Sequence, residues 1–484
     1  MPGKIIICLM QKKDPTLRRP LEAAFHNALS YLENLDKTPV AATADLLTLR
    51  NRLNKPLTSE GVDPEQIIDE LVSDVHGGLL GSAGGRFFGW VVGGSLSAAL
   101  GADWLTATWD QNAALYACSP ASATVEEVVG FWLKDILGLP ADASFALVTG
   151  CQMAHVTCLA AARHSLLAGR GWDVEQQGLF GAPPIRILTS SERHGSIERA
   201  VRLLGLGHAH VIDLQPDFGG RLQPETIEQA LQSEPSALTI LLLQAGDLNI
   251  GAYDPFETLI PIAKRYGAWV HVDGAFGLWV AASPHYKRLV RGFEAADSWA
   301  TDGHKWLNVP YECGYAFIAD AKSHRASMSH RAAYLVHDED ARDQMDWNPE
   351  WSRRGRGFPT YAALRQLGRD GVANLVERCC KHAHSIVMRI GDLAGAEVLW
   401  EPTINQGLVR FLDPRPNASE KDHDHWTDKV IAAILTAGEA FFGGTTWRGH
   451  RAMRVSVCNW QTSDEDVERV VASVAQVMKS LKTA

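Results

Sequence analysis

The most constraining feature of this sequence is an alternation of strand-like and helix-like segments across residues 145–318. Short apolar runs typical of β-strands recur along this stretch, and a helical pattern follows each of the first four. We expect strands at Phe145–Val148, Ile185–Leu188, His210–Leu214, Leu238–Leu243, Trp269–Asp273, Ser298–Thr301 and Tyr315–Ile318. Such alternation predicts an α/β fold with a mostly parallel sheet covered by helices on both faces. Ligands bind such sheets beyond the carboxyl ends of the strands.

The flanking regions have a different pattern. Residues 14–75 carry helical periodicity, and helix returns from about Thr360 to Leu393. The stretch Gly84–Leu105 is rich in Gly, Phe and Trp and has almost no charge, so we expect it to be buried or to face a partner subunit. From Val398 onward, strand-like and helical segments indicate a smaller α+β domain. The predicted division is an N-terminal helical segment at 1–84, a large domain at 85–385 and a small C-terminal domain at 386–484.

The charge balance argues against a nucleic-acid or membrane partner. The 484 residues include 46 Lys and Arg against 56 Asp and Glu, a formal net charge of −10, and no basic tract occurs. The apolar run Ile5–Met10 is too short for a signal sequence, and no segment has the apolar length of a membrane span. Eight cysteines without a CxxC pair indicate reduced thiols. We therefore expect a cytoplasmic protein.

The string that most resembles a metal site is Asp422-His423-Asp424-His425. It lies among Ser, Glu and Lys, and no pair of histidines at helical i, i+4 spacing accompanies it. We expect a surface loop at this position and no metal ion.

Lys305 is the strongest candidate for the chemistry. It is flanked by His304 and Trp306 in a segment poor in charge, and such surroundings would desolvate an ammonium group and lower its pKa. A neutral lysine amine is a nucleophile toward aldehydes. Asp273, at the end of an expected strand, could hold a pyridinium nitrogen protonated, and this pair is what pyridoxal phosphate requires. The simpler interpretation is a surface lysine and an aspartate that caps a turn.

Two further features fit the same cofactor. The strand that ends at Val148 leads through Thr149-Gly150-Cys151-Gln152 into a helix, whose first N–H groups and positive dipole end could bind a phosphate. His194 follows another strand and could lie over an aromatic ring, although a loop histidine bonded to backbone is the simpler interpretation. No GxxxxGK[ST] motif and no GxGxxG in a strand context is present.

Taken together, these motifs carry a family resemblance. HVDGAFG at 271–277 and DSWATDGHKW at 297–306, with the turn at 149–152, resemble the group II pyridoxal-phosphate-dependent amino-acid decarboxylases. That family includes aromatic-L-amino-acid and glutamate decarboxylases and the aldehyde synthases derived from them. The resemblance covers nearly all of the chain, and also includes His194, GDLNIGAYDP at 246–255, Phe87-Phe88-Gly89-Trp90, Arg353-Arg354 and Arg454-Val455-Ser456.

The resemblance implies an aspartate-aminotransferase-like large domain of fold type I with a mixed sheet, and a homodimer with active sites at the subunit interface. It implies that Lys305 forms a Schiff base with pyridoxal 5'-phosphate, that Asp273 pairs with the ring nitrogen, and that His194 stacks on the ring. The implied cofactor-binding residues are Thr149, Gly150, Cys151, Gln152, His194, Asp273, Ala275, His304 and Lys305. The implied substrate pocket contains Phe87, Phe88 and Trp90, which favours an aromatic substrate.

Several positions depart from the family pattern. The usual turn Ser-Gly-Gly-Thr-Glu-Ala-Asn is replaced by residues 149–155, which end in His155, and the usual Asn-Pro before the His-Lys pair is Asp302-Gly303. The loop tyrosine thought to protonate the α-carbon in the decarboxylases is Gln344 here, and the nearby tyrosine is Tyr334. The identity of the proton donor is therefore open.

The predicted function is decarboxylation of an L-amino acid to the amine and carbon dioxide, with a small-molecule amino acid as the substrate. An aldehyde synthase, in which oxygen intercepts the carbanionic intermediate, is the alternative raised by Gln344. Two alternatives come from other classes: a metal-dependent hydrolase that uses His271, Asp273 and His304, and a non-catalytic binding protein that retained the fold.

Overall fold

The computed structural model describes residues 15–330 and 341–483, and its centre is a seven-stranded sheet in the order β1-β7-β6-β5-β4-β2-β3. The strands are β1 Ser144–Val148, β2 Ile185–Ser190, β3 Val211–Leu214, β4 Leu238–Gln244, β5 Trp269–Asp273, β6 Ser298–Asp302 and β7 Gly314–Ile318. Only β7 runs antiparallel to its neighbours β1 and β6, and the other pairs are parallel. The predicted mixed, mostly parallel sheet is confirmed.

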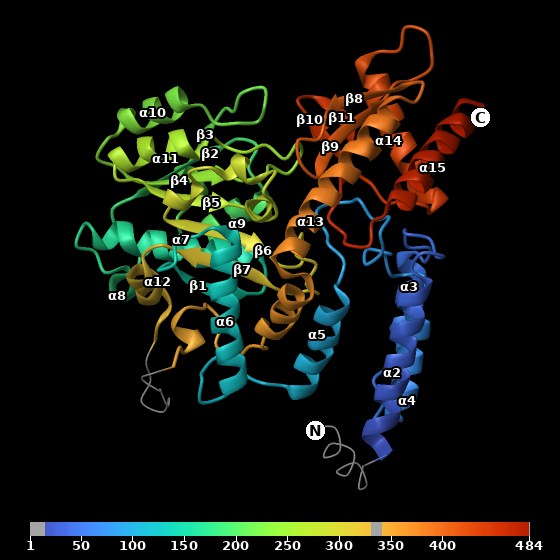
Figure 1. Cartoon of the computed structure of the whole chain (residues 1–484), viewed down its shortest axis with the longest axis horizontal. Helices are drawn as coiled ribbons and strands as arrows, with labels where there is room; N and C mark the ends of the chain where they lie inside the picture. The colour runs from blue at the N-terminus through green and yellow to red at the C-terminus, as the bar shows by residue number, and fades with distance from the viewer. Residues whose placement is uncertain (1–14, 331–340, 484) are drawn as a thin grey trace.

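Helices cover both faces of this sheet (Figure 1). The helices of the described residues, in both domains, are α2 Pro15–Asn34, α3 Leu46–Leu53, α4 Pro64–Asp74, α5 Ser97–Trp109, α6 Pro120–Leu137, α7 Cys151–Ala168, α8 Val174–Gln177, α9 Gly195–Leu203, α10 Pro224–Ser233, α11 Phe256–Arg265, α12 Ala321–Met328, α13 Gly357–Gly391, α14 Glu420–Ala437 and α15 Asp464–Thr483. Successive strand residues point to opposite faces. Phe145 and Leu147 therefore join the core beneath α6, α10 and α11, while Ala146 and Val148 join the core beneath α7 and α9.

The small domain is a four-stranded antiparallel sheet in the order β10-β11-β9-β8, with α14 and α15 beside it (Figure 1). Its strands are β8 Ala396–Trp400, β9 Gln406–Phe411, β10 Gly443–Trp447 and β11 His450–Ser456. The strand-like segment that was expected from Val398 onward is a hairpin of two strands, β8 and β9. The expected loop at 422–425 is wrong, because these residues form the first turns of α14. Ser419 and Asp422 make a reciprocal capping box that starts this helix.

Helix α13 joins the two domains (Figure 1). Its first part packs on α5 and α6, and its later part packs on β9 and α15. A break at Gly368, with φ of 62°, separates the two parts, a backbone conformation that favours glycine. The predicted boundary between residues 385 and 386 falls within this helix, and the domain division stays a prediction.

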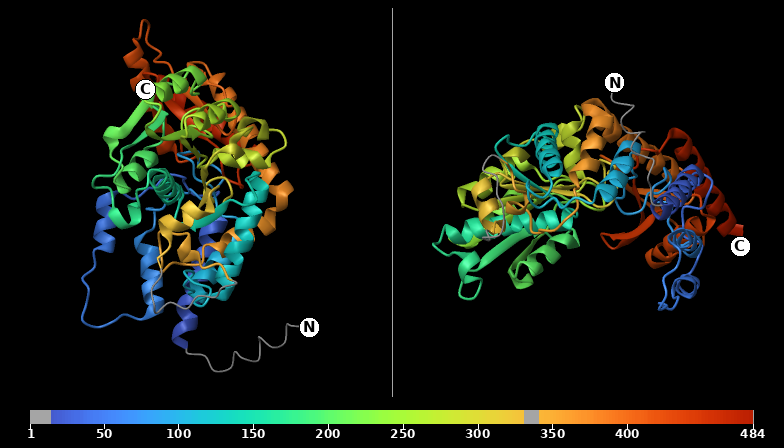
Figure 2. Two further views of the ribbon diagram at one scale, coloured as in Figure 1. Left: turned by 90° about the vertical axis from the view of Figure 1, so that its left-hand side faces the viewer. Right: turned by 90° about the horizontal axis from the view of Figure 1, so that it is seen from below.

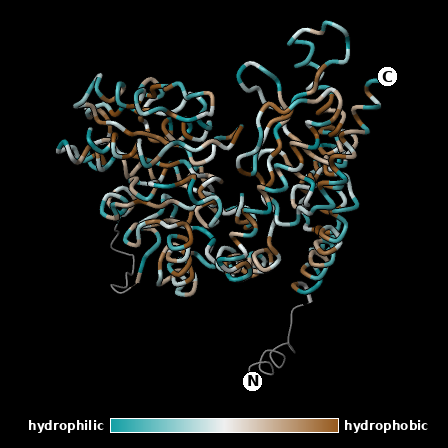
Figure 3. The backbone as a smooth tube through the Cα atoms, turned by 45° about the horizontal axis from the view of Figure 1, so that its top comes forward, coloured by the Kyte–Doolittle hydropathy of each residue, from teal (hydrophilic) through white to brown (hydrophobic). Residues whose placement is uncertain are grey.

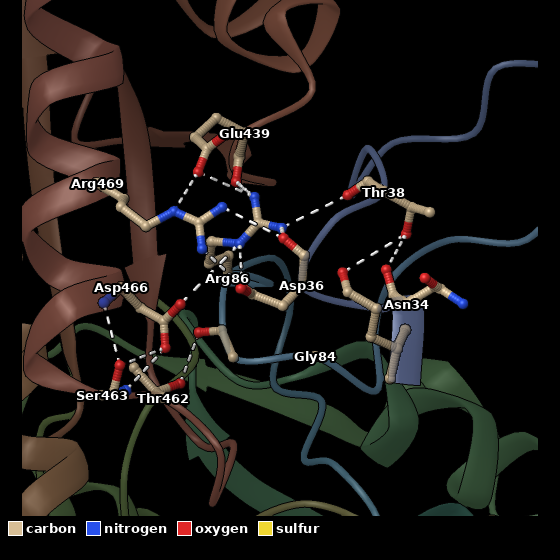
Figure 4. A network of polar contacts seen from close by, with 12 residues as sticks. Asn34, Asp36, Thr38, Gly84, Arg86, Glu439, Thr462, Ser463, Asp466 and Arg469 are labelled. Carbon is tan, nitrogen blue, oxygen red and sulfur yellow. Dashed lines mark hydrogen bonds and ion pairs between the residues drawn. The ribbon is translucent and has the colours of Figure 1, made fainter. Parts of the chain in front are cut away.

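The N-terminal helices α2, α3 and α4 lie beside the small domain, far from the sheet's β3 edge (Figures 1 and 2). A buried arginine, Arg86, fastens this segment to the C-terminal domain (Figure 4). Its guanidinium donates to the carbonyl oxygens of Asp36 at 2.9 Å and Glu439 at 2.5 Å. Arg469 of α15 also donates to the Asp36 carboxylate at 2.7 Å. The first and last parts of the chain are therefore held together.

Hydrophobic residues concentrate along the inner strands of both domains, and hydrophilic ones in the outer loops (Figure 3). Within residues 15–330 and 341–483, no helix combines the length and apolar character needed to cross a membrane.

Candidate active site

A cavity of about 760 Å³ opens at the carboxyl ends of β1, β4, β5 and β6. Its size is in the range of small-molecule sites. The predicted residues that line it are Trp90, Gly150, Cys151, Gln152, His194, Asp273, Ala275, His304 and Lys305. Chain topology therefore brings together residues that are up to 215 positions apart in sequence (305 − 90).

Lys305 lies in the turn after β6, and its backbone contacts the segment after Trp90. The Gly93 N–H donates to the carbonyl of His304 at 3.1 Å. A Cβ atom on Gly93 would overlap the carbonyl oxygen of Lys305. This close approach requires glycine and fixes the backbone that carries the lysine.

The charge on Lys305 differs from the sequence expectation. Its Nζ lies 3.6 Å from Oδ2 of Asp302. Burial by itself would lower the pKa of Lys305, but the attraction of Asp302 and Asp273 outweighs it, and the pKa is raised above its ordinary value. The predicted lowering was wrong because it considered the apolar neighbours in sequence and not the carboxylates that the fold places around the amine.

Asp273 is the last residue of β5 and is buried at the floor of the cavity. Its Oδ1 accepts from the Ala275 N–H at 3.1 Å and lies 3.6 Å from Nε2 of His155. Burial opposes ionisation, yet the attraction of His155, His194 and Lys305 lowers the pKa of Asp273 below its ordinary value. An ionised carboxylate therefore faces the cavity.

Helix α7 begins at the cavity directly after β1. Gly150 occupies the N-cap position without a side-chain cap, so the free N–H groups of the first turn are available to an anion. One of them is already used, because the Cys151 N–H donates to Oδ1 of Asp302 at 2.6 Å. The predicted phosphate cradle thus contains a carboxylate.

His194 stands at the mouth of the cavity as the N-cap of α9. Its Nδ1 accepts from the Ser196 N–H at 3.1 Å, which fixes the ring orientation. Ala275 lines the same cavity, and its carbonyl oxygen accepts from the Asp302 N–H at 3.0 Å.

Three predicted residues do not line the cavity. Thr149 lies one position before the N-cap of α7. Phe87 and Phe88 are buried, at 1% and 0% exposure, and stack on Phe441 and Phe442 of the small domain with ring centroids 4.6 and 5.3 Å apart. Their assignment to the substrate pocket is therefore corrected: they hold the segment before Trp90 against the small domain.

The sequence of residues 48–412 matches the family model described as the pyridoxal-dependent decarboxylase conserved domain. The chain belongs to this family. It is therefore a carboxy-lyase, and its cofactor is pyridoxal 5'-phosphate. The resemblance inferred from HVDGAFG and GHKW is confirmed.

The curated relatives of this decarboxylase differ in substrate and product. An aromatic-L-amino-acid decarboxylase of Bacillus atrophaeus is 22% identical over 92% of both chains. An L-2,4-diaminobutyrate decarboxylase of Rhizobium meliloti is 27% identical over 78% of this chain and 73% of its own. A phenylacetaldehyde synthase of Petunia hybrida is 26% identical over 88% of this chain and 87% of its own.

The fold agrees with the family. The structure of Oryza sativa TDC with PLP and tryptamine superposes with a TM-score of 0.90 at 20% identity, and covers 97% of this chain and 100% of that one. The predicted fold type I, with a small C-terminal domain, is confirmed.

Unpaired polar atoms in the cavity show, independently of the comparisons, that the residues of this decarboxylase fit the cofactor. Two buried polar atoms on residues that line the cavity, Nε2 of Gln244 and Nδ1 of His304, have no hydrogen-bond partner. Buried polar groups are normally paired, so these atoms indicate a polar ligand. Lys305, ionised Asp273 and the free end of α7 supply the amine, the anion and the phosphate donors that the cofactor needs.

Sequence reasoning missed Gln244 and Tyr311, which also line the cavity. The ring of Tyr311 stacks on His304 with centroids 4.1 Å apart. Gln244 ends a strand and could have been found by the same rule that found Asp273, whereas no sequence signal marks Tyr311.

The metal-dependent alternative is not supported by the geometry. Among the described ranges, the group whose ligand atoms lie close enough for a metal ion is Cys151, His155 and Asp273. The predicted trio of His271, Asp273 and His304 does not form such a group.

Gln344, at the position of the family's loop tyrosine, is fully buried. Its Nε2 donates to the carbonyl of Ala123 at 3.4 Å, and its Oε1 contacts Arg342. The side chain is held in the interior and does not line the cavity. Tyr334 lies outside the described residues.

Proposed function

We propose that this protein decarboxylates an L-amino acid to the corresponding amine. The observation that carries the proposal is the convergence of Lys305, Asp273 and His194 on one cavity at the end of α7. When bound, the cofactor accepts the electron pair that the departing carbon dioxide leaves behind.

The proposed roles of the residues follow from their positions. Lys305 binds the cofactor covalently, and Asp273 keeps the ring nitrogen charged from the cavity floor. His194, oriented by its cap on Ser196, covers one face of the ring, and Ala275 packs on the other. The backbone N–H of Gln152 holds the phosphate beside His304, while the Cys151 N–H stays bonded to Asp302.

We propose an aromatic or large apolar substrate side chain. Trp90, Val91, Phe276 and Tyr311 contribute apolar surface to the cavity. Arg454 also lines it. Its Nη1 donates to the carbonyl of Leu248 at 2.7 Å, and the guanidinium has further N–H groups that can donate to a carboxylate. The apolar side chains that line the cavity favour an aromatic amino acid over a diamino acid as the substrate.

The aldehyde synthase is the second candidate, and Gln344 favours it. Without a proton donor at this position, oxygen can intercept the carbanionic intermediate and release aldehyde, ammonia and peroxide. We favour the amine as the product because His194 lines the cavity and can carry a proton to the α-carbon.

A homodimer is proposed as the active form. Phe25 of α2 and Trp104 of α5 meet edge-on with centroids 6.0 Å apart, and Leu17, Leu21, Leu105 and Trp109 extend this apolar surface into solvent. Exposed apolar patches of this kind mark protein interfaces. A cytoplasmic location is also proposed, supported by the free state of the seven cysteines in the described ranges.

One assay tests the proposed function. The holoenzyme is incubated with a panel of aromatic, acidic and diamino acids, and carbon dioxide, amine, ammonia and peroxide are measured together. Carbon dioxide and amine in equal amounts are expected from an aromatic substrate. Peroxide in step with carbon dioxide would select the aldehyde synthase, and no carbon dioxide from any amino acid would overturn both.

The control for this assay is Lys305→Ala. Wild-type protein should be yellow and should lose its visible band on borohydride treatment. The variant should lack the band and release no carbon dioxide.

A further inference from the structure

A line of buried polar side chains runs from Asp273 into the interior, away from the cavity. Nε2 of His155, on α7, lies 3.6 Å from Oδ1 of Asp273. Nδ1 of His155 lies 3.0 Å from Nε2 of His271, and Nδ1 of His271 lies 2.9 Å from Oγ of Ser298. His155, His271 and Ser298 are all 0% exposed. None of the three lines the cavity, and the roles proposed above use none of them.

The protons in this line can be assigned from its ends. Burial lowers the pKa of His155, and it lowers the pKa of His271 to about 3. Each ring is therefore neutral and carries one proton. Trp269 Nε1–H donates to Oγ of Ser298 at 3.0 Å, so the Ser298 hydroxyl already has a donor and can give its own hydrogen to His271.

Two orders of hydrogen bonds are then possible. In the first, Ser298 donates to His271, His271 donates to His155, and His155 presents Nε2–H to Asp273. In the reverse order, His155 presents a lone pair to the carboxylate, and only the thiol of Cys151, 3.5 Å from Nε2, can satisfy it. A thiol is a weak donor, and a lone pair facing an ionised carboxylate is repulsive. The first order is therefore favoured.

The position of the second donor to Asp273 completes the geometry. The Ala275 N–H is hydrogen-bonded to Oδ1, and Nε2 of His155 faces the same oxygen at 3.6 Å, so both lie on one side of the carboxylate and leave Oδ2 for the ring nitrogen.

We propose that His155 is a positioning residue that directs its Nε2–H toward Asp273, 3.6 Å away, and holds it ionised and aligned with the ring nitrogen of the cofactor. Ser298 and His271 fix the tautomer in which His155 does this. The inference rests on the proposed pairing of Asp273 with that nitrogen. If His155 acts in this way, the charge on the cofactor ring depends on His155, His271 and Ser298, which do not contact that ring.

The test reads the ring nitrogen directly and needs no substrate. Holoenzyme is prepared with cofactor carrying ¹⁵N in the ring, and the ¹⁵N signal is followed against pH in wild type, His155→Gln and His155→Phe. The wild-type signal should be that of a protonated ring nitrogen. In His155→Phe, the pH at which this signal changes should fall by at least about one unit, a tenfold loss in the equilibrium constant for protonation. In His155→Gln, the amide can donate from a similar place. The signal should therefore change at a pH close to that of the wild type.

The matched control is His324→Phe. His324 is also 0% exposed, with ring contacts to Ser144 and to the carbonyl of Trp347, both at 2.8 Å, but it has no contact with Asp273. The His324→Phe substitution should therefore leave the ¹⁵N titration unchanged. A wild-type titration in His155→Phe, or an equal shift in His324→Phe, would overturn the proposal.

A second variant decides the case in which His155→Phe fails to fold. Ser298→Ala removes the first donor of the line and should shift the ¹⁵N titration in the same direction, while an unchanged titration would overturn the proposal. Since these signals are recorded without an amino acid, a failure of the proposed function appears separately, as the absence of carbon dioxide from a protein whose ring nitrogen is protonated.

Discussion

Asp302 is the residue at which this chain departs most sharply from its expected chemistry. Its carboxylate accepts the Cys151 N–H at the start of α7 and lies 3.6 Å from both Nζ of Lys305 and Nε2 of His304. The helix end that would bind a phosphate therefore carries a negative charge of its own. That charge also raises the pKa of Lys305, which disfavours the neutral amine needed for covalent attachment.

Asp302→Asn should therefore bind the cofactor more tightly. The amide keeps an acceptor for the Cys151 N–H and removes the charge, so we expect the Kd for pyridoxal 5'-phosphate to fall about tenfold, or roughly 1.4 kcal/mol. Equilibrium dialysis measures this change. Asp320→Asn, at the cap of α12, is the control and should change nothing. An equal or larger Kd in Asp302→Asn would contradict the prediction.

At the scale of elements, the segment after Trp90 acts as a support for the lysine turn. Gly93 and Gly94 donate to His304 O at 3.1 Å and to Oδ1 of Asn308 at 2.7 Å. The stacking of Phe87 and Phe88 on the small domain holds this segment in place. The large pyridoxal-binding domain and the small domain are thus coupled at the backbone of Lys305.

Gly93→Ala should disturb the site without changing any reacting group. Its Cβ would overlap the carbonyl of Lys305, so we expect at least a tenfold rise in the cofactor Kd and a lower Tm. Gly101→Ala is the matched control, because no atom lies within 4 Å of the added Cβ. Since Gly101 lies within helix α5, this substitution should raise the free energy of unfolding by up to about 1 kcal/mol. Thermal unfolding with and without cofactor compares the two. Equal effects would refute the supporting role.

The sequence predicted the seven central strands from short runs rich in apolar residues. Six of the strands are buried along nearly their whole length, whereas β3, at the edge of the sheet, is largely exposed. The prediction failed for β10, because Gly443, Gly444 and the two threonines after them lack apolar character. The assignment of residues 422–425 to a loop was wrong because His and Asp are common in turns, whereas here they lie in the first turns of α14, which the capping box of Ser419 and Asp422 starts.

The candidate site could be predicted in part. Lys305, Asp273 and His194 were found because each follows a strand end. The approach of His155 to His271, 116 residues apart, depends on how α7 packs across β5, which no local pattern encodes. The exposure of a side chain also depends on residues that are distant in sequence. Phe87 and Phe88 were expected in the substrate pocket because the sequence does not show that Phe441 and Phe442 cover them.

At the scale of the whole molecule, the buried neutral histidines make stability depend on pH. The pKa values of His271 and His324 fall to about 3 because both rings are buried. The unfolded chain takes up protons at these residues from about pH 6.5 downward, whereas the folded chain does not until about pH 3. Their contribution to stability is therefore complete above about pH 6.5 and is lost as the pH falls toward 3.

Urea unfolding at pH 7.5, 6.0 and 5.0 checks this sign. The free energy of unfolding should decrease at each step. His324→Gln should be less stable at pH 7.5 but should show a shallower decrease. A free energy that is constant between pH 7.5 and 5.0 would contradict the prediction.

The apolar surface of α2 predicts the oligomeric state. Leu21 is 61% exposed and Phe25 44% exposed, so the double variant Leu21→Asp, Phe25→Asp should convert a dimer to a monomer in light-scattering measurements. Leu57, which is fully exposed and lies outside the helices, provides the control Leu57→Asp, which should remain a dimer. A monomeric wild type, or a dimeric double variant, would refute the interface.

The clasp around Arg86 has a consequence for synthesis on the ribosome. Arg86 bonds to Glu439, 353 residues later in the chain, and Asp36 bonds to Arg469, 433 residues later. At 5–20 residues per second, the N-terminal helices wait roughly 20 to 70 seconds for Glu439 to be translated. During that time the guanidinium of Arg86 lacks its partner in the small domain. The contacts that fasten the N-terminal helices to the small domain can therefore form only after nearly all of the chain has been translated.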